Sequence, residues 1–97
     1  MRPCTDYSKV VIYKIVPNDK TLNFVYVDYT TDFVRRKAQH KKVIKRTKHL
    51  YDFVMEHGGW DCFTIAIIEK FPCSDNIDAK IRVQYWTDLL NLEFKTL

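Results

Sequence analysis

The chain has 97 residues, of which 46% are hydrophobic, and it includes six Tyr, six Phe and two Trp. This length predicts a single domain over residues 1–97, with a core at about 9–90 and loose ends at 1–8 and 91–97. Only two glycines and three prolines, with no internal repeat, argue against linkers and disorder. We find no apolar run long enough for a membrane span and no signal-peptide pattern, so we expect an intracellular protein without membrane contact.

Positive charge is concentrated in one segment. The net charge is +4, but eight Lys and Arg residues and no acidic residue occur between positions 35 and 48. They are Arg35, Arg36, Lys37, Lys41, Lys42, Lys45, Arg46 and Lys48. This cluster favours an anionic partner, with nucleic acid as the first candidate, although a solvated helix face gives the same pattern.

The cysteines indicate a reducing compartment. Cys4, Cys62 and Cys73 are odd in number, and their spacing matches no zinc or redox motif. We interpret them as buried or idle thiols rather than as ligands of a zinc site shared with the histidines.

The first half of the chain predicts a hairpin followed by a helix. The apolar run at about 10–16 is typical of a strand covered on both faces. A turn cluster at 17–20 separates it from a second strand at about 23–27. Thr30 or Thr31 can cap the helix expected at about 32–44, and Asp32 is favourable at its N-terminus. Arg36 and His40 are four residues apart and therefore project from one face of this helix.

The second half predicts a helix, a strand and a longer helix. Thr47 can cap the helix at about 48–56, which ends at glycines 58 and 59. The apolar strand at 63–69 is expected at the centre of a small sheet. Ser74 or Asp75 begins the last helix, which runs to about residue 90 and carries two apolar stripes, at 79, 83, 86 and 90 and at 77, 81, 85 and 89. Two stripes exceed what a small monomer needs to bury, so a homodimer through this helix is one alternative.

Five fragments resemble the GIY-YIG endonuclease family. Val11-Ile12-Tyr13 is similar to the first element of its signature and Tyr26-Val27-Asp28 to the second, and the spacing from Tyr26 to Arg36 and His40 also fits. The stretch 57–60 (His-Gly-Gly-Trp) with the strand at 63–71, and the stretch 82–86 (Arg-Val-Gln-Tyr-Trp), resemble members from phages and large DNA viruses. The similarity covers about residues 9–90.

The resemblance implies an α+β fold, in which a small three-stranded, mainly antiparallel sheet is flanked by three helices. It places Tyr13, Tyr26, Arg36 and His40 at the catalytic positions, with Tyr13 beside Tyr26 on facing strands. In active members one divalent ion, Mg²⁺ or Mn²⁺, is held by a glutamate on the last helix, and DNA is cut by hydrolysis. We carry the four positions over as phosphate contacts only.

Two departures from the family argue against hydrolysis. The glycine of the second element is replaced by Asp28, and the metal-binding glutamate is replaced by Val83, which cannot coordinate a cation. Asp28 would close the site through an ion pair with Arg36 or serve as a substitute metal ligand, and we favour the ion pair. We therefore expect a catalytically degenerate nuclease-like domain that needs no cofactor and binds nucleic acid, DNA rather than RNA, through its basic helix. The alternatives are an active endonuclease that holds Mg²⁺ or Mn²⁺ with Asp28 or Glu69, and a protein-interaction module.

Overall fold

The computed structural model describes residues 6–19, 21–22, 24–42 and 48–94, with side chains described as far as Leu90. The described residues form β1 (Val11–Pro17), β2 (Tyr26–Thr30), α1 (Phe33–His40), α2 (Lys48–Glu56), β3 (Phe63–Lys70) and α3 (Asn76–Phe94). Short 3-10 helices, η1 (Tyr7–Lys9) and η3 (Trp60–Cys62), precede β1 and β3. This is the predicted α+β fold of three strands and three helices. No helix in the described ranges is long and apolar enough to cross a membrane.

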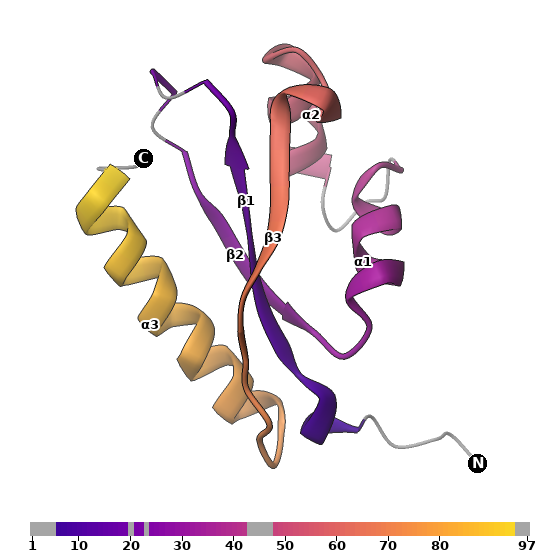
Figure 1. Cartoon of the computed structure of the whole chain (residues 1–97), viewed down its shortest axis with the longest axis vertical. Helices are drawn as coiled ribbons and strands as arrows, with labels where there is room; N and C mark the ends of the chain where they lie inside the picture. Colours follow the sequence, from indigo (N-terminus) through magenta and orange to yellow (C-terminus); the bar gives the residue numbers. More distant parts are fainter. Residues whose placement is uncertain (1–5, 20, 23, 43–47, 95–97) are drawn as a thin grey trace.

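The three strands form one antiparallel sheet in the order β2-β1-β3. Figure 1 shows α3 on one face of this sheet and α1 with α2 on the other. The expectation that the strand at 63–69 lies at the centre is wrong, because β1 is central and β3 is an edge strand. An apolar run alone does not distinguish the two positions, and Ile67 in β3 is 44% exposed.

The central strand β1 is covered on both faces, as its apolar sequence predicts. Successive residues of a strand point to opposite faces of the sheet. Ile12 packs with Ala79 of α3, whereas Tyr13 packs in the cluster that contains Leu50 and Val54 of α2. Burying one large aliphatic side chain contributes about 1.5–3 kcal/mol, so these two clusters anchor the helices to the sheet.

The turn from β2 into α1 differs from the prediction. Strand β2 covers Tyr26–Thr30 rather than about 23–27, because its pairing with β1 continues to Thr30, which lies opposite Val11. The Asp32 side chain accepts a hydrogen bond from the Arg35 backbone N–H at 3.1 Å, so Asp32 is the N-cap of α1 and the prediction of Thr30 or Thr31 as the cap is wrong. Helix α1 ends at His40, before the predicted residue 44, and residues 43–47 lie outside the described ranges.

Helix α2 ends and helix α3 begins as the sequence predicts, whereas Thr47, the predicted cap of α2, lies outside the described residues. Gly58 and Gly59 have φ values of +104° and +85°, and the Gly59 N–H donates to the Val54 oxygen at 2.9 Å, which ends α2. The Asp75 side chain accepts from the Asp78 N–H at 3.0 Å and caps α3. This helix continues to Phe94, four residues beyond the predicted end.

Candidate nucleic-acid interface

Tyr13 and His40 form a buried pair between the centre of the sheet and the last residue of α1. Tyr13 is 0% exposed and His40 is 1% exposed. The Tyr13 hydroxyl lies 2.7 Å from His40 Nε2, and the tautomer of the imidazole decides which group donates. The hydrogen bond compensates the cost of removing both polar atoms from water.

Tyr26 reaches the same pair from β2. Its ring centroid is 5.8 Å from that of His40, and its hydroxyl donates to Asp28 Oδ2 at 3.1 Å. In the strand register Tyr26 lies opposite Ile15, and Asp28 lies opposite Tyr13. The prediction that the two tyrosines face each other directly is therefore wrong. Burial and the negative charge of Asp28 raise the pKa of Tyr26. The phenol therefore stays protonated at neutral pH and acts as a hydrogen-bond donor.

Asp28 and Arg36 form the ion pair favoured from the sequence. Arg36 Nη1 lies 3.6 Å from Asp28 Oδ2, and the two side chains are 22% and 27% exposed. Arg36 also donates to the Tyr29 backbone oxygen at 3.3 Å, and the Asp28 carboxylate accepts from the Tyr29 N–H at 2.8 Å. The Asp28 carboxylate thus accepts hydrogen bonds from a phenol and a backbone amide and is paired with a guanidinium. Phosphate oxygens bind the same kinds of group.

The four predicted positions, Tyr13, Tyr26, Arg36 and His40, therefore lie in one region between β1, β2 and α1. His40 contacts both tyrosines, and Asp28 connects Tyr26 to Arg36. The inner part of this region is packed, since Tyr13 and His40 are almost fully buried. The outer part of the cluster is Arg36, which lines two surface pockets.

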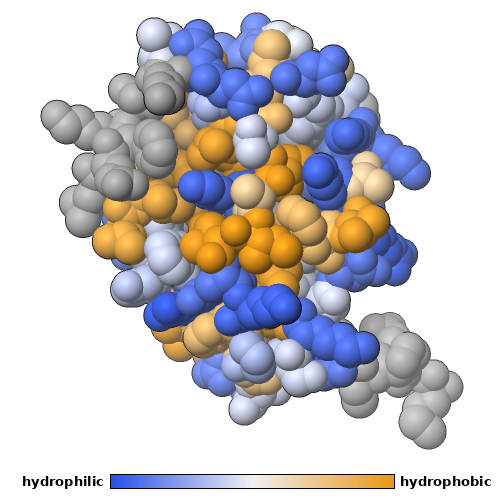
Figure 2. Space-filling model, viewed as in Figure 1, coloured by the Kyte–Doolittle hydropathy of each residue, from blue (hydrophilic) through white to orange (hydrophobic). Residues whose placement is uncertain are grey.

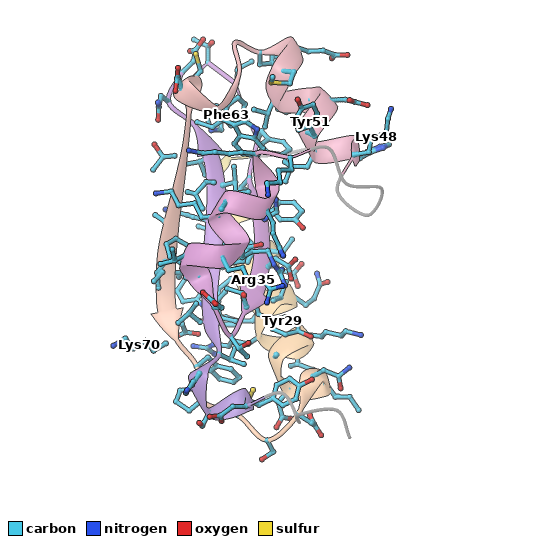
Figure 3. The ribbon with its side chains drawn as sticks, turned by 90° about the vertical axis from the view of Figure 1, so that its right-hand side faces the viewer. Tyr29, Arg35, Lys48, Tyr51, Phe63 and Lys70 are labelled. Atoms are coloured by element: carbon cyan, nitrogen blue, oxygen red, sulfur yellow. The ribbon has the colours of Figure 1, made fainter. Side chains whose placement is uncertain are left out.

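Two pockets lined by described residues include Arg36. The larger, of about 240 Å³, is lined by Asp28, Tyr29, Arg36 and Lys80. The smaller, of about 150 Å³, is lined by Thr30, Thr31, Asp32, Arg35, Arg36 and Gln39. Arg35 of α1 and Tyr29 of β2, each of which lines one of these pockets, are labelled in Figure 3.

Lys80 is a candidate site residue that the sequence reasoning missed. It belongs to α3, on the other face of the sheet from α1, and it lines the same pocket as Arg36 beside β2. Lys80 precedes Val83 by three residues and so shares a face of the helix with it. That spacing alone does not predict that it lies near Arg36, which depends on how α3 packs against the sheet.

The basic segment is only partly described. Arg35, Lys37, Lys41, Lys42 and Lys48 are exposed, whereas Arg36 is half-buried. Lys45 and Arg46 lie outside the described residues. Lys48 Nζ lies 3.1 Å from Asp52 Oδ2, so the charge of Lys48 is partly compensated within α2. Four of the eight exposed Lys and Arg side chains among the described residues therefore lie on α1 and on the turn after it.

The described residues do not fit the divalent metal that the family resemblance implies. In the ranges that the structure describes, no three His, Cys, Asp or Glu side chains lie together. Val83 packs in the apolar cluster under α3. Glu69 accepts hydrogen bonds from Arg82 and, at 2.8 Å, from Trp86, and the bond from Arg82 is the main cause of its lowered pKa. It therefore lies beside α3, whereas Asp28 is on the α1 side of the sheet.

Comparisons of the chain with family models, with curated proteins and with solved structures found no match. The chemistry of this region is consequently inferred from its residues and their geometry. Three features matter for that inference: a packed Tyr-Tyr-His cluster, an arginine paired with a carboxylate, and exposed cations along α1.

Proposed function

We propose that this chain is a nucleic-acid-binding domain of the GIY-YIG nuclease type in which hydrolysis has been lost. The observation that carries the proposal is the contact between Arg36 and Asp28. The arginine that would hold the phosphate in an active member is paired with a carboxylate of the same chain. In this proposal Tyr13, Tyr26 and His40, which pack against one another beside Arg36, are remnants of the catalytic positions.

The exposed cations of α1 supply the affinity in this account. Lysine and arginine side chains that neutralise phosphates release counterions, which drives binding at low salt. Such contacts follow the backbone and carry no sequence information, so we expect weak sequence specificity. The family resemblance favours DNA over RNA as the partner.

Cleavage is not expected, because the described residues offer no placed group of ligands for a divalent ion. Metal-assisted hydrolysis needs a carboxylate that holds the ion near the leaving oxygen. The side chain of Val83 has no oxygen that could bind an ion. Asp28 would have to leave Arg36, and Glu69 would have to leave Arg82, before either could bind an ion. No contact among the described residues favours the alternative of an endonuclease with a displaced ligand.

A gel-shift series with matched variants tests the proposal. The double variant Lys41→Gln/Lys42→Gln removes two exposed charges beside α1, and Lys70→Gln removes one exposed charge from the end of β3. Figure 3 shows Lys70 on the side of the molecule opposite Lys48. We expect the double variant to weaken binding to a short duplex and Lys70→Gln to leave it nearly unchanged. Equal losses in both variants, or no binding by the natural chain, would refute the proposal.

A second candidate function, self-association, is favoured by a separate surface. Ile77, Ile81, Tyr85 and Leu89 form one row at i, i+4 spacing along α3 and are 62%, 64%, 48% and 41% exposed. Figure 2 shows an apolar band across the middle of the face on which α3 and β3 lie. A row of this spacing packs into the grooves of another helix at a crossing angle of about −50°. The row is symmetric about residue 83, so a second copy of α3 presents a matching row in the antiparallel direction.

Sedimentation velocity over a range of concentrations tests this second candidate. We expect the natural chain to show a monomer–dimer equilibrium and Ile81→Asp to remain monomeric. Gln84→Asp, on an exposed polar position of the same helix, is the control for added charge. A natural chain that stays monomeric at high concentration would exclude the homodimer.

A further inference from the structure

The pocket at the edge of β2 combines side chains from three elements. Asp28 and Tyr29 come from β2, Arg36 comes from α1, and Lys80 comes from α3. The two helices lie on opposite faces of the sheet (Figure 1). The edge of β2 is therefore a place at which cations from both faces border one cavity.

The charges that line this pocket do not cancel. Arg36 is paired with Asp28, whose carboxylate also accepts from Tyr26 and from the Tyr29 N–H. Lys80 lines the same cavity, is exposed, and has no ion pair among the described residues. The pocket thus carries one net positive charge, which matches the single negative charge of a phosphodiester.

The size and position of the pocket also suit a phosphate group. Its volume of about 240 Å³ is several times the roughly 30 Å³ that a water molecule occupies in the liquid. Ala79, the neighbour of Lys80, is fully buried and packs with Ile12 of β1. The backbone of this turn of α3 is therefore fixed against the sheet, and the lysine side chain extends from a rigid base.

We infer that this pocket binds a backbone phosphate of the nucleic acid between Arg36 and Lys80. The inference rests on the proposed function and adds a contact from α3 to those of α1. Bound nucleic acid then runs past the edge of β2, where it touches helices from both faces of the sheet. Lys80 acts as a phosphate-contacting residue and contributes no sequence preference.

The test measures duplex binding by fluorescence anisotropy at several salt concentrations. Four proteins are compared: the natural chain, Lys80→Gln, Lys80→Arg and Lys70→Gln. Losing one phosphate contact weakens binding on the order of threefold to tenfold and reduces the salt slope by about one. We expect that loss for Lys80→Gln, near-natural binding for Lys80→Arg, and no change of slope for Lys70→Gln.

The outcomes separate this inference from the proposed function. If the natural chain does not bind the duplex, the proposed function fails. If it binds and Lys80→Gln equals Lys70→Gln in both affinity and slope, the pocket is no phosphate site and the proposed function stands. Thermal unfolding of each variant shows whether the fold is retained, which the exposure of both lysines leads us to expect.

Discussion

Replacing Asp28 by asparagine should strengthen nucleic-acid binding. Asparagine removes the negative charge but keeps a side-chain oxygen that can accept from the Tyr29 N–H, as the carboxylate does at 2.8 Å. Arg36 loses its ion-pair partner and becomes more available to a phosphate. The expected gain follows from the distance between the carboxylate and the phosphate that Arg36 would bind.

The distance between these two anionic groups sets the size of the expected gain in affinity. Arg36 Nη1 is 3.6 Å from Asp28 Oδ2, and a charged hydrogen bond adds about 2.9 Å. The two anionic groups would then lie within about 6.5 Å of each other. Their repulsion is about 0.6 kcal/mol in water and about 2.6 kcal/mol at an effective dielectric constant of 20. Because both side chains are about a quarter exposed, we expect about 1 kcal/mol, or roughly fivefold in affinity.

The assay compares Asp28→Asn with Asp88→Asn by fluorescence anisotropy on one duplex. Asp88 is exposed on α3 and accepts a hydrogen bond from Gln84, so its replacement changes the net charge equally at a different place. We expect Asp28→Asn to bind about fivefold more tightly than Asp88→Asn at low salt, with a smaller difference at high salt. Equal affinities in two folded variants would refute the idea that the charge of Asp28 weakens phosphate binding at Arg36.

Three further predictions concern the core, the pH dependence and the missing ligand. Tyr13→Phe should lower the free energy of unfolding by about 1–3 kcal/mol, because His40 is 1% exposed and loses its hydrogen bond with the Tyr13 hydroxyl. Thermal unfolding followed by circular dichroism should show a Tm lower by about 4–8 °C per kcal/mol. Glu69 has a lowered pKa in the fold, so its stabilising effect is present above about pH 4.3 and is lost as the pH falls through the folded-state value. The Tm of the natural chain should then fall more steeply than that of Glu69→Gln between pH 6 and pH 3. Val83→Glu combined with Asp28→Gly should restore Mg²⁺-dependent nicking of supercoiled plasmid.

Each of these predictions has an outcome that contradicts it. A Tm unchanged in Tyr13→Phe would mean that the hydroxyl contributes nothing to the buried pair. If the Tm of the natural chain and that of Glu69→Gln fell in parallel with pH, the ion pair of Glu69 with Arg82 would not contribute to acid stability. A folded double variant that binds DNA without nicking it would show that Val83 does not occupy the position of the metal ligand.

The order of the elements could be predicted from the sequence, because several boundaries have a local chemical cause. Glycines 58 and 59 end α2, and Asp75 caps α3, as expected. The position of a strand within the sheet has no such local signal. The apolar run of β3 is compatible with a central strand, and only the pairing shows that β1 occupies that place.

The candidate site was predictable where residues are linked along the chain. Arg36 and His40 share one helix, and their common face follows from the helical period. The register between Tyr13 and Tyr26 depends on how β1 and β2 pair, and it differs by two residues from direct facing. Lys80 was missed because its place in the pocket depends on the packing of α3 across the sheet, which its own sequence neighbourhood does not specify.

The most direct measurement incubates the natural chain with supercoiled plasmid in the presence of Mg²⁺ or Mn²⁺, beside a gel shift at two salt concentrations. The account predicts that the plasmid stays supercoiled while its mobility shifts at low salt and the shift weakens at high salt. Metal-dependent nicking by the natural chain would contradict the loss of hydrolysis and would make Asp28 and Glu69 the next residues to replace. Absence of any shift at low salt would contradict the binding function itself.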